Sequence, residues 1–159
     1  MNRKLLTAEG YQRLQDELND IVRKERPEIT KIVSWAASLG DRSENADYHY
    51  NKRKLRELDR RIRFLMKLFE VAQKIEYSPE QDGKAFFGAW VTLENDDNET
   101  IKFRIVGDEE IYGQKEYISL QSPMAKACLG KSVDDEVQVQ TPTGKKTWYI
   151  SEIFYQKDS

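Results

Sequence analysis

Two acidic residues stand three positions apart in a short polar run, residues 40–48 (GDRSENADY), and this spacing is suited to chemistry. If Asp41 opens a helix, its carboxylate and that of Glu44 lie on one side of the first turn, with β-carbons roughly 5–6 Å apart. Such a pair could share a hard divalent cation such as Mg²⁺, which prefers oxygen ligands. Two carboxylates do not complete a metal site, so a partner would have to supply the other ligands.

The same spacing also has a purely structural interpretation. Asp at a helix cap followed three positions later by Glu forms a capping box, with Asp replacing the usual Ser or Thr, and such a cap stabilises a helix by about 0.5–2 kcal/mol. Spacing alone favours this role for Asp41 and Glu44. The two roles are compatible, because a capping side chain can face solvent and still present an oxygen.

A dense set of Lys and Arg residues follows the polar run on a segment with helical periodicity. Five of them recur at spacings of four, four, three and four and form one stripe beside the apolar positions. A charge run is usually only a solvated helix face, but helix stability does not require a single sign of charge, and repulsion disfavours it. We expect this surface, the basic face, to bind the phosphates of a single nucleic-acid strand. The basic face comprises Lys52, Arg53, Arg56, Arg60, Arg61, Arg63 and Lys67.

Two long helical segments must position these residues. In each, spacings of three and four define a seam with period 3.5, and two such seams joined by a few residues bury their apolar stripes most simply as an antiparallel hairpin. Thr7 is expected to cap the first helix, and residues 7–39 give an arm of roughly 48 Å. The predicted seams are Tyr11, Leu14, Leu18, Ile21, Glu25, Glu28, Ile32, Trp35 and Leu39, then Tyr48, Asn51, Leu55, Leu58, Ile62, Leu65, Phe69 and Ala72.

The first seam is interrupted in its middle. Glu25 and Glu28 occupy two of its positions, and Pro27 cannot donate a backbone hydrogen bond. We therefore expect a kink or a local loosening at Pro27, after which the pattern resumes in phase. Near the polar run, Trp35 and Tyr48 are expected to pack at the tip rather than to serve as platforms for base stacking.

A second domain follows residues 77–83 (YSPEQDG), where the hydrophobic period changes to two. Ser122 is expected to cap one short helix, with Pro123 at its first position and Gly130 at its end. The chain is therefore predicted to be α+β, with a long antiparallel coiled-coil hairpin before a small antiparallel sheet domain that has one short helix. The expected strands are residues 86–93, 101–105, 117–120, 137–139 and 147–155.

Charge divides the chain into two halves. Residues 1–77 carry 17 Lys and Arg against 13 Asp and Glu, a net of +4, whereas residues 78–159 carry 9 against 15, a net of −6. The first half is suited to anions. The single cysteine, Cys128, excludes an internal disulfide, and with the single His49 it leaves too few soft ligands for structural zinc. Without a signal peptide or a long apolar span, the protein is expected to be cytoplasmic.

The run of residues 35–48 closely resembles the tip of the bacterial Gre transcript-cleavage factors, whose pattern is G-D-x-x-E-N-A-(D/E)-Y. The resemblance spans essentially the whole chain. Residues 41–44 and the dense basic run after Tyr50 are similar to the GreB branch of that family. Further matches are residues 26–28 (RPE), 86–89 (FFGA), 105–107 (IVG) and 118–125 (ISLQSPMA).

The resemblance implies a mechanism for the tip. Gre factors insert their coiled coil into the secondary channel of RNA polymerase and stimulate Mg²⁺-dependent cleavage of the 3′ end of backtracked RNA, a reaction intrinsic to the polymerase. By this resemblance Asp41 and Glu44 hold a Mg²⁺ jointly with the polymerase, which completes the site, while Ser43 and Asn45 support the tip. The basic face would guide the extruded RNA by its phosphates.

The resemblance also implies a division of labour between domains. Residues 1–77 would form the arm, residues 78–83 a linker, and residues 84–159 an FKBP-like domain that docks on the β′ coiled coil at the channel rim. The docking residues would be Ser122, Pro123 and Met124, in a monomer that contacts no membrane.

Two rival functions stay open at this stage. One is a non-catalytic regulator that occupies the secondary channel, against which the presence of Asp41 and Glu44 argues. The other is a coiled-coil RNA-binding module that acts without polymerase; its RNA affinity would survive changes at residues 122–124.

Overall fold

The computed structural model describes residues 3–40 and 45–155 of the 159-residue chain. The chain forms two compact units: a helical unit of residues 11–72, and a sheet unit that joins residues 3–10 to residues 73–159. No helix in the described ranges is both long and apolar enough to cross a membrane.

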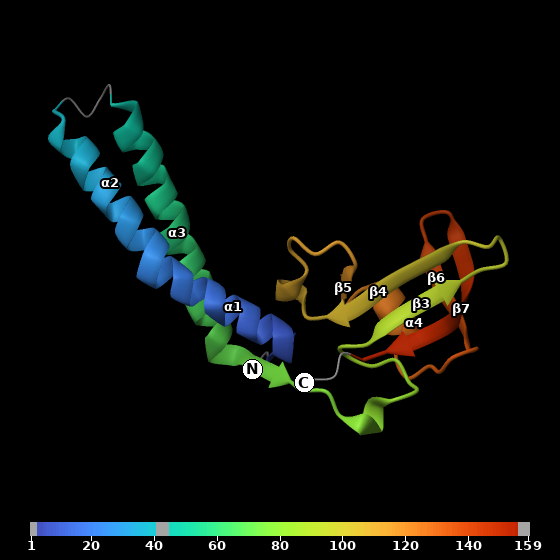
Figure 1. Cartoon of the computed structure of the whole chain (residues 1–159). Helices are drawn as coiled ribbons and strands as arrows, with labels where there is room; N and C mark the ends of the chain where they lie inside the picture. The colour runs from blue at the N-terminus through green and yellow to red at the C-terminus, as the bar shows by residue number, and fades with distance from the viewer. Residues whose placement is uncertain (1–2, 41–44, 156–159) are drawn as a thin grey trace. The chain divides into compact units, whose positions relative to one another are not determined.

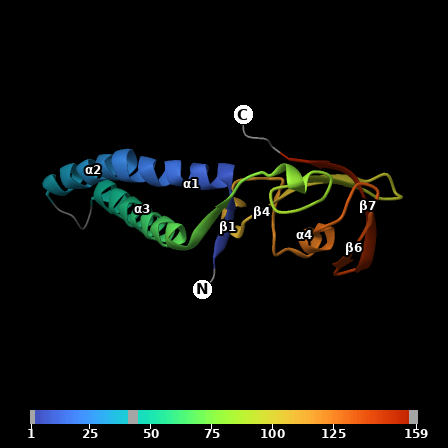
Figure 2. The same ribbon diagram turned by 90° about the horizontal axis from the view of Figure 1, so that it is seen from below.

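The helical unit is the predicted antiparallel hairpin, with α2 lying beside α3 (Figures 1 and 2). Thr7 caps the first helix as expected, because its Oγ1 accepts a hydrogen bond of 3.1 Å from the Gly10 N–H. Near the base of the hairpin, the rings of Tyr11 and Phe69 meet edge to face at 5.1 Å. The helical elements are α1 (Ala8–Asp20), the π-helical turn η1 (Ile21–Glu25), α2 (Arg26–Ser38) and α3 (Ala46–Val71).

The π-helical turn changes which residues face the partner helix. The Arg26 N–H donates to the carbonyl of Ile21, five residues back, so η1 holds one residue more than an α-helical turn. Pro27, at the start of α2, has no N–H with which to restore the usual ladder. The predicted irregularity is therefore present, but it lies just before Pro27 rather than at it.

The prediction that the seam resumes in phase is wrong. The most buried seam residues are Leu14, Ile21, Ile29 and Ala36, at intervals of seven, eight and seven. The extra residue in the π-helical turn rotates α2 by one position. Two predicted seam residues of α2, Ile32 and Trp35, are consequently exposed, as is Leu39 at its C-cap. In α3, which has no such insertion, the predicted seam is buried or half-buried throughout.

The sheet unit is confirmed as α+β, although its main sheet is mixed. Its five strands run in the order β5-β4-β3-β7-β6, and β4 pairs with β5 in parallel while the other neighbours are antiparallel. The first predicted strand starts late, because residues 86–89 form a turn in which Gly88 has φ +90° and donates to the Ile105 carbonyl. The elements are β3 (Trp90–Glu94), β4 (Thr100–Val106), β5 (Tyr117–Ser119), α4 (Pro123–Cys128), β6 (Glu136–Thr141) and β7 (Gly144–Phe154), with 3₁₀ turns η3 (Pro79–Gln81) and η4 (Asp108–Glu110).

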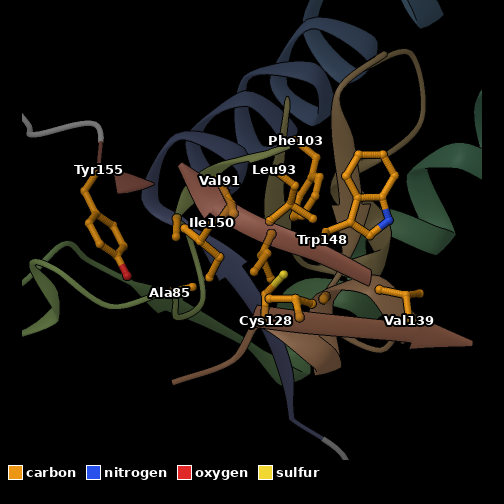
Figure 3. Packing of buried hydrophobic residues seen from close by; sticks show 13 residues of the cluster. Ala85, Val91, Leu93, Phe103, Cys128, Val139, Trp148, Ile150 and Tyr155 are labelled. Carbon is orange, nitrogen blue, oxygen red and sulfur yellow. The ribbon is translucent and has the colours of Figure 1, made fainter. Parts of the chain in front are cut away.

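One hydrophobic core holds the sheet unit together (Figure 3). Strand residues such as Val91, Phe103 and Ile150 point from the sheet toward Cys128 of α4. Burial raises the pKa of the Cys128 thiol to about 11, so at neutral pH the thiol stays protonated and packs as a small apolar group.

The N-terminal residues join the sheet unit through a buried carboxylate. β1 (Lys4–Thr7) pairs with β2 (Ala72–Ile75), two strands that the hydrophobic pattern did not predict. Glu110 is fully buried and accepts hydrogen bonds from the N–H groups of Thr7 (2.9 Å) and Gly107 (2.8 Å) and from the Thr7 hydroxyl. A β-carbon on Gly10 would lie 1.9 Å from this carboxylate, which explains glycine there. These hydrogen bonds satisfy the buried carboxylate and hold Thr7 within the sheet unit.

Candidate functional site at the hairpin tip and basic face

The tip of the hairpin is built around Asn45. α2 ends at Ser38, and Gly40 follows its cap in the left-handed region at φ +110°. Asn45 caps α3: its Oδ1 accepts from the Tyr48 N–H at 3.0 Å, while its Nδ2 donates to the Ala36 carbonyl at 2.6 Å. One amide side chain therefore ties the end of α2 to the start of α3.

The position of this cap corrects the expectation that Asp41 opens the second helix. α3 begins at Ala46, after Asn45, so its cap uses neither Asp41 nor Glu44. Both acids and Ser43 lie outside the described residues. The structure thus assigns the capping role to Asn45, which was predicted only to support the tip. Its residue type could have indicated this role, because Asn is among the preferred N-cap residues.

The two aromatic residues near the tip have different surroundings. Tyr48 is 7% exposed, meets the His49 ring edge to face at 5.4 Å and accepts a hydrogen bond of 2.8 Å from the Lys52 ammonium. Its predicted packing role is confirmed. Trp35 is 56% exposed, so the same prediction for Trp35 is wrong, and the cause is the rotation of α2 by the π-helical turn.

The basic face runs along α3. All of its members are exposed except Arg61, whose guanidinium forms a two-point ion pair with Glu17, at 2.5 Å from Nε and 2.9 Å from Nη2. Asp59, one of two acids within this stretch, is bound at 2.7 Å by Arg26. Among the described residues, the members that form neither an ion pair nor a side-chain hydrogen bond are Arg53, Arg56, Arg60, Arg63 and Lys67. Their charge is available to an external anion.

The proposed docking residues lie where β5 leads into α4. Ser122 caps this helix, with its hydroxyl accepting from the Ala125 N–H at 3.2 Å and donating to the Ser119 carbonyl at 2.7 Å. Pro123 is exposed and Met124 half-buried. Ser122 therefore stabilises the start of α4. Of the three predicted docking residues, Pro123 and Met124 provide most of the surface that a partner could contact.

In the described ranges no three His, Cys, Asp or Glu side chains gather in a way that could hold a metal ion.

Comparison with known proteins then identifies the family of the chain. A model of the N-terminal region of the GreA/GreB transcription elongation factors matches residues 4–73, and one of their C-terminal region matches residues 80–155. The chain belongs to the GreA/GreB family of transcription elongation factors.

The relatives of this Gre-family chain span its full length. It is 60% identical over 155 residues to transcription elongation factor GreB of Pseudomonas putida, covering 98% of this chain and 96% of that protein. It is 61% identical over 158 residues to GreB of Vibrio cholerae, covering 99% and 98%. Among solved structures, GreA factor homolog 1 of Thermus thermophilus matches at 26% identity and a TM-score of 0.43, covering 96% of this chain and 99% of that one.

Family membership confirms the predicted function. The chain is a transcription elongation factor that stimulates cleavage of backtracked transcripts by RNA polymerase and is not itself the enzyme. RNA polymerase is accordingly its partner.

Proposed function

We propose that Asp41 and Glu44 carry the stimulation by acting together at the polymerase active centre when the hairpin enters the secondary channel. The observation that carries this proposal is the cap of α3. Because Asn45 supplies the capping oxygen and also clamps α2, neither acid is required for the start of that helix. The capping role that their spacing allowed is thus filled by Asn45, which favours the alternative role of binding a ligand outside the chain.

A magnesium ion fits the chemistry of these two side chains. Carboxylate oxygens are the hard donors that Mg²⁺ prefers, and the ion usually keeps several waters or takes ligands from a partner. When bound, Mg²⁺ stabilises the charge that develops on the attacking and leaving oxygens of a phosphodiester. Asp41 and Glu44 would contribute two oxygens and two negative charges, and the polymerase would complete the site.

The basic face would position the extruded RNA. Its unpaired guanidinium and ammonium groups recur every helical turn, so that successive phosphates of one strand can be bound without reading the bases. Lys52 differs from the others because it is bonded to the buried Tyr48 hydroxyl. We infer that Lys52 chiefly braces the tip, whereas Arg56, Arg60 and Arg63 contact the RNA.

The sheet unit would dock on the β′ coiled coil at the channel rim through Pro123 and Met124, with Ser122 fixing their turn. This contact would hold a monomeric factor on the polymerase, in the bacterial cytoplasm, while the tip reaches the active centre. The two tasks therefore reside in different units of the chain.

A cleavage assay tests the assignment of the acids. Polymerase is stalled in a backtracked complex with 5′-labelled RNA and incubated with Mg²⁺ and the unchanged protein, Asp41→Asn or Asp47→Asn. Asp47 is the matched control, because it is an exposed acid in the first turn of α3. We expect shortened RNA that can be extended again with the unchanged protein and with Asp47→Asn, and almost none with Asp41→Asn. Equal binding of all three forms with no shortening by any would make the protein a channel-occupying regulator.

A further inference from the structure

A groove on the outward side of α3 combines an aromatic ring with cations. Tyr50, Arg53, Lys54 and Glu57 line a shallow depression, at spacings of three and four that place them on one helix face. A second shallow depression beside it is lined by the same Glu57 together with Arg60 and Arg61. We call this surface, formed by Tyr50, Arg53, Lys54, Glu57, Arg60 and Arg61, the Tyr50 groove.

Tyr50 is the unusual member of the groove. Its side chain is 61% exposed, and among the described residues it forms no hydrogen bond or ring contact. Tyr48, two positions earlier, is buried in the hairpin and bonded to Lys52. Packing of the hairpin therefore explains Tyr48, whereas Tyr50 has an exposed ring that a ligand could contact.

The charges of the groove favour a nucleic acid as that ligand. Arg53, Lys54 and Arg60 form no ion pair among the described residues, and Glu57 is the one acid among the residues that line the groove. Arg53 and Arg60 also belong to the basic face, so the two surfaces are continuous. A strand that follows the basic face by its phosphates can turn a base toward the Tyr50 ring.

We propose that Tyr50 stacks on one base of the extruded RNA while Arg53 and Lys54 bind the flanking phosphates. Proteins that bind single strands without a sequence code combine cations for the backbone with aromatic faces for the bases. The proposal rests on the proposed function and adds to it a base subsite, which the phosphate contacts alone do not provide. Because purines stack more extensively than pyrimidines, cleavage should be faster when a purine occupies that position.

The test removes each partner of the stack separately. Backtracked complexes are assembled on synthetic RNA with an unpaired 3′ segment, in which each extruded position in turn is made abasic. Tyr50→Leu removes the ring and Tyr50→Trp keeps one, while Met66→Ala changes another exposed apolar side chain of α3 outside the groove. Every rate is divided by the polymerase's own rate without factor, and polymerase binding is measured for each variant.

A stack predicts coupling between the ring and one base. With intact RNA, Tyr50→Leu should lower the stimulated rate roughly tenfold, within the range for loss of one base–aromatic contact, whereas Tyr50→Trp and Met66→Ala should change it little. On RNA that is abasic at one particular position, the cleavage rate stimulated by the unchanged protein should fall by a similar factor. The rate stimulated by Tyr50→Leu should fall no further on that RNA.

Three results would overturn the proposal. An unchanged rate for Tyr50→Leu would remove any role for the ring. An equal loss on intact RNA and on every abasic RNA, with polymerase binding weakened, would show that Tyr50 contacts the polymerase instead. No stimulation by the unchanged protein would refute the proposed function itself, and the base subsite with it.

Discussion

Replacing Asn45 by alanine should loosen the tip and reduce cleavage without changing an acidic residue. The change removes two hydrogen bonds, the cap of α3 at 3.0 Å and the bond to the Ala36 carbonyl at 2.6 Å. Loss of an N-cap costs about 0.5–2 kcal/mol, and loss of a typical further hydrogen bond about 0.5–1.5 kcal/mol. Together they lower the free energy of unfolding of the hairpin by about 1–3.5 kcal/mol.

The measurement is urea unfolding followed by far-ultraviolet circular dichroism, together with the cleavage rate in backtracked complexes. Asn51→Ala is the matched control, because the Asn51 amide donates at 2.9 Å to the Asp47 carbonyl within α3 and, among the described residues, hydrogen-bonds to no second helix. Asn45→Asp retains a capping oxygen but loses the donor to Ala36. We expect the order of stability to be unchanged protein and Asn51→Ala first, then Asn45→Asp, then Asn45→Ala.

Cleavage should follow the same order, since the acids are useful only if the tip holds them in place. The reasoning would be refuted if Asn45→Ala unfolded at the same urea concentration as the unchanged protein. It would also be refuted if the variant were destabilised as expected but cleaved at the full rate, because the clamp would then not position the acids.

Two further perturbations test other parts of the account. Glu110→Gln replaces one acceptor oxygen of a fully buried carboxylate by an amide group that faces N–H donors. The sheet unit should therefore lose about 1–3 kcal/mol of stability, measured by thermal or urea unfolding. An unchanged unfolding midpoint would contradict the role of this buried hydrogen-bond network. Reversing the charge of Arg56, Arg60 and Arg63 together should shift cleavage from long extruded segments toward short fragments, measured by gel analysis of the released RNA; an unchanged fragment distribution would exclude guidance by the basic face.

The hairpin was predictable because its signal is long and repeated. Spacings of three and four over two segments indicate an amphipathic pair, and a short polar run between them indicates a turn. The π-helical turn was not predictable in the same way. Spacings of three and four between seam positions continue through residues 21–39, so the sequence pattern gives no sign that the helix holds an extra residue there. Its consequence appears only in space, where Ile29 and Ala36 replace Ile32 and Trp35 against α3.

The sheet unit shows a similar limit. Alternation located β4, β6 and β7, but Phe86 and Phe87 looked like strand residues although they form a turn stabilised by Gly88. β1 and β2 have only four residues each, so alternation is too brief to distinguish them from the ends of neighbouring helices. The pairing of such short strands depends on tertiary contacts like that of Thr7 with Glu110.

The site residues were predictable where they belong to a specific sequence motif. They were not predictable where the role of a residue depends on its position in the folded structure. The tip pattern singled out Asp41 and Glu44, whereas spacing alone favoured the capping role that Asn45 fills. Tyr50 lies two positions after Tyr48 on α3. Their opposite burial follows from helix geometry, since two positions along a helix turn the side chain by about 200°.

The most direct test of the central claim is the Mg²⁺ dependence of the stimulated cleavage rate for the unchanged protein, Asp41→Asn and Glu44→Gln in the same backtracked complex. If the acids hold a cation jointly with the polymerase, each variant should need at least about tenfold more Mg²⁺ for half of its maximal rate, since each removes a carboxylate ligand. Part of the lost rate should return at high Mg²⁺. A lower rate with an unchanged half-saturating concentration would contradict the account, because the acids would then act by some means other than holding the metal.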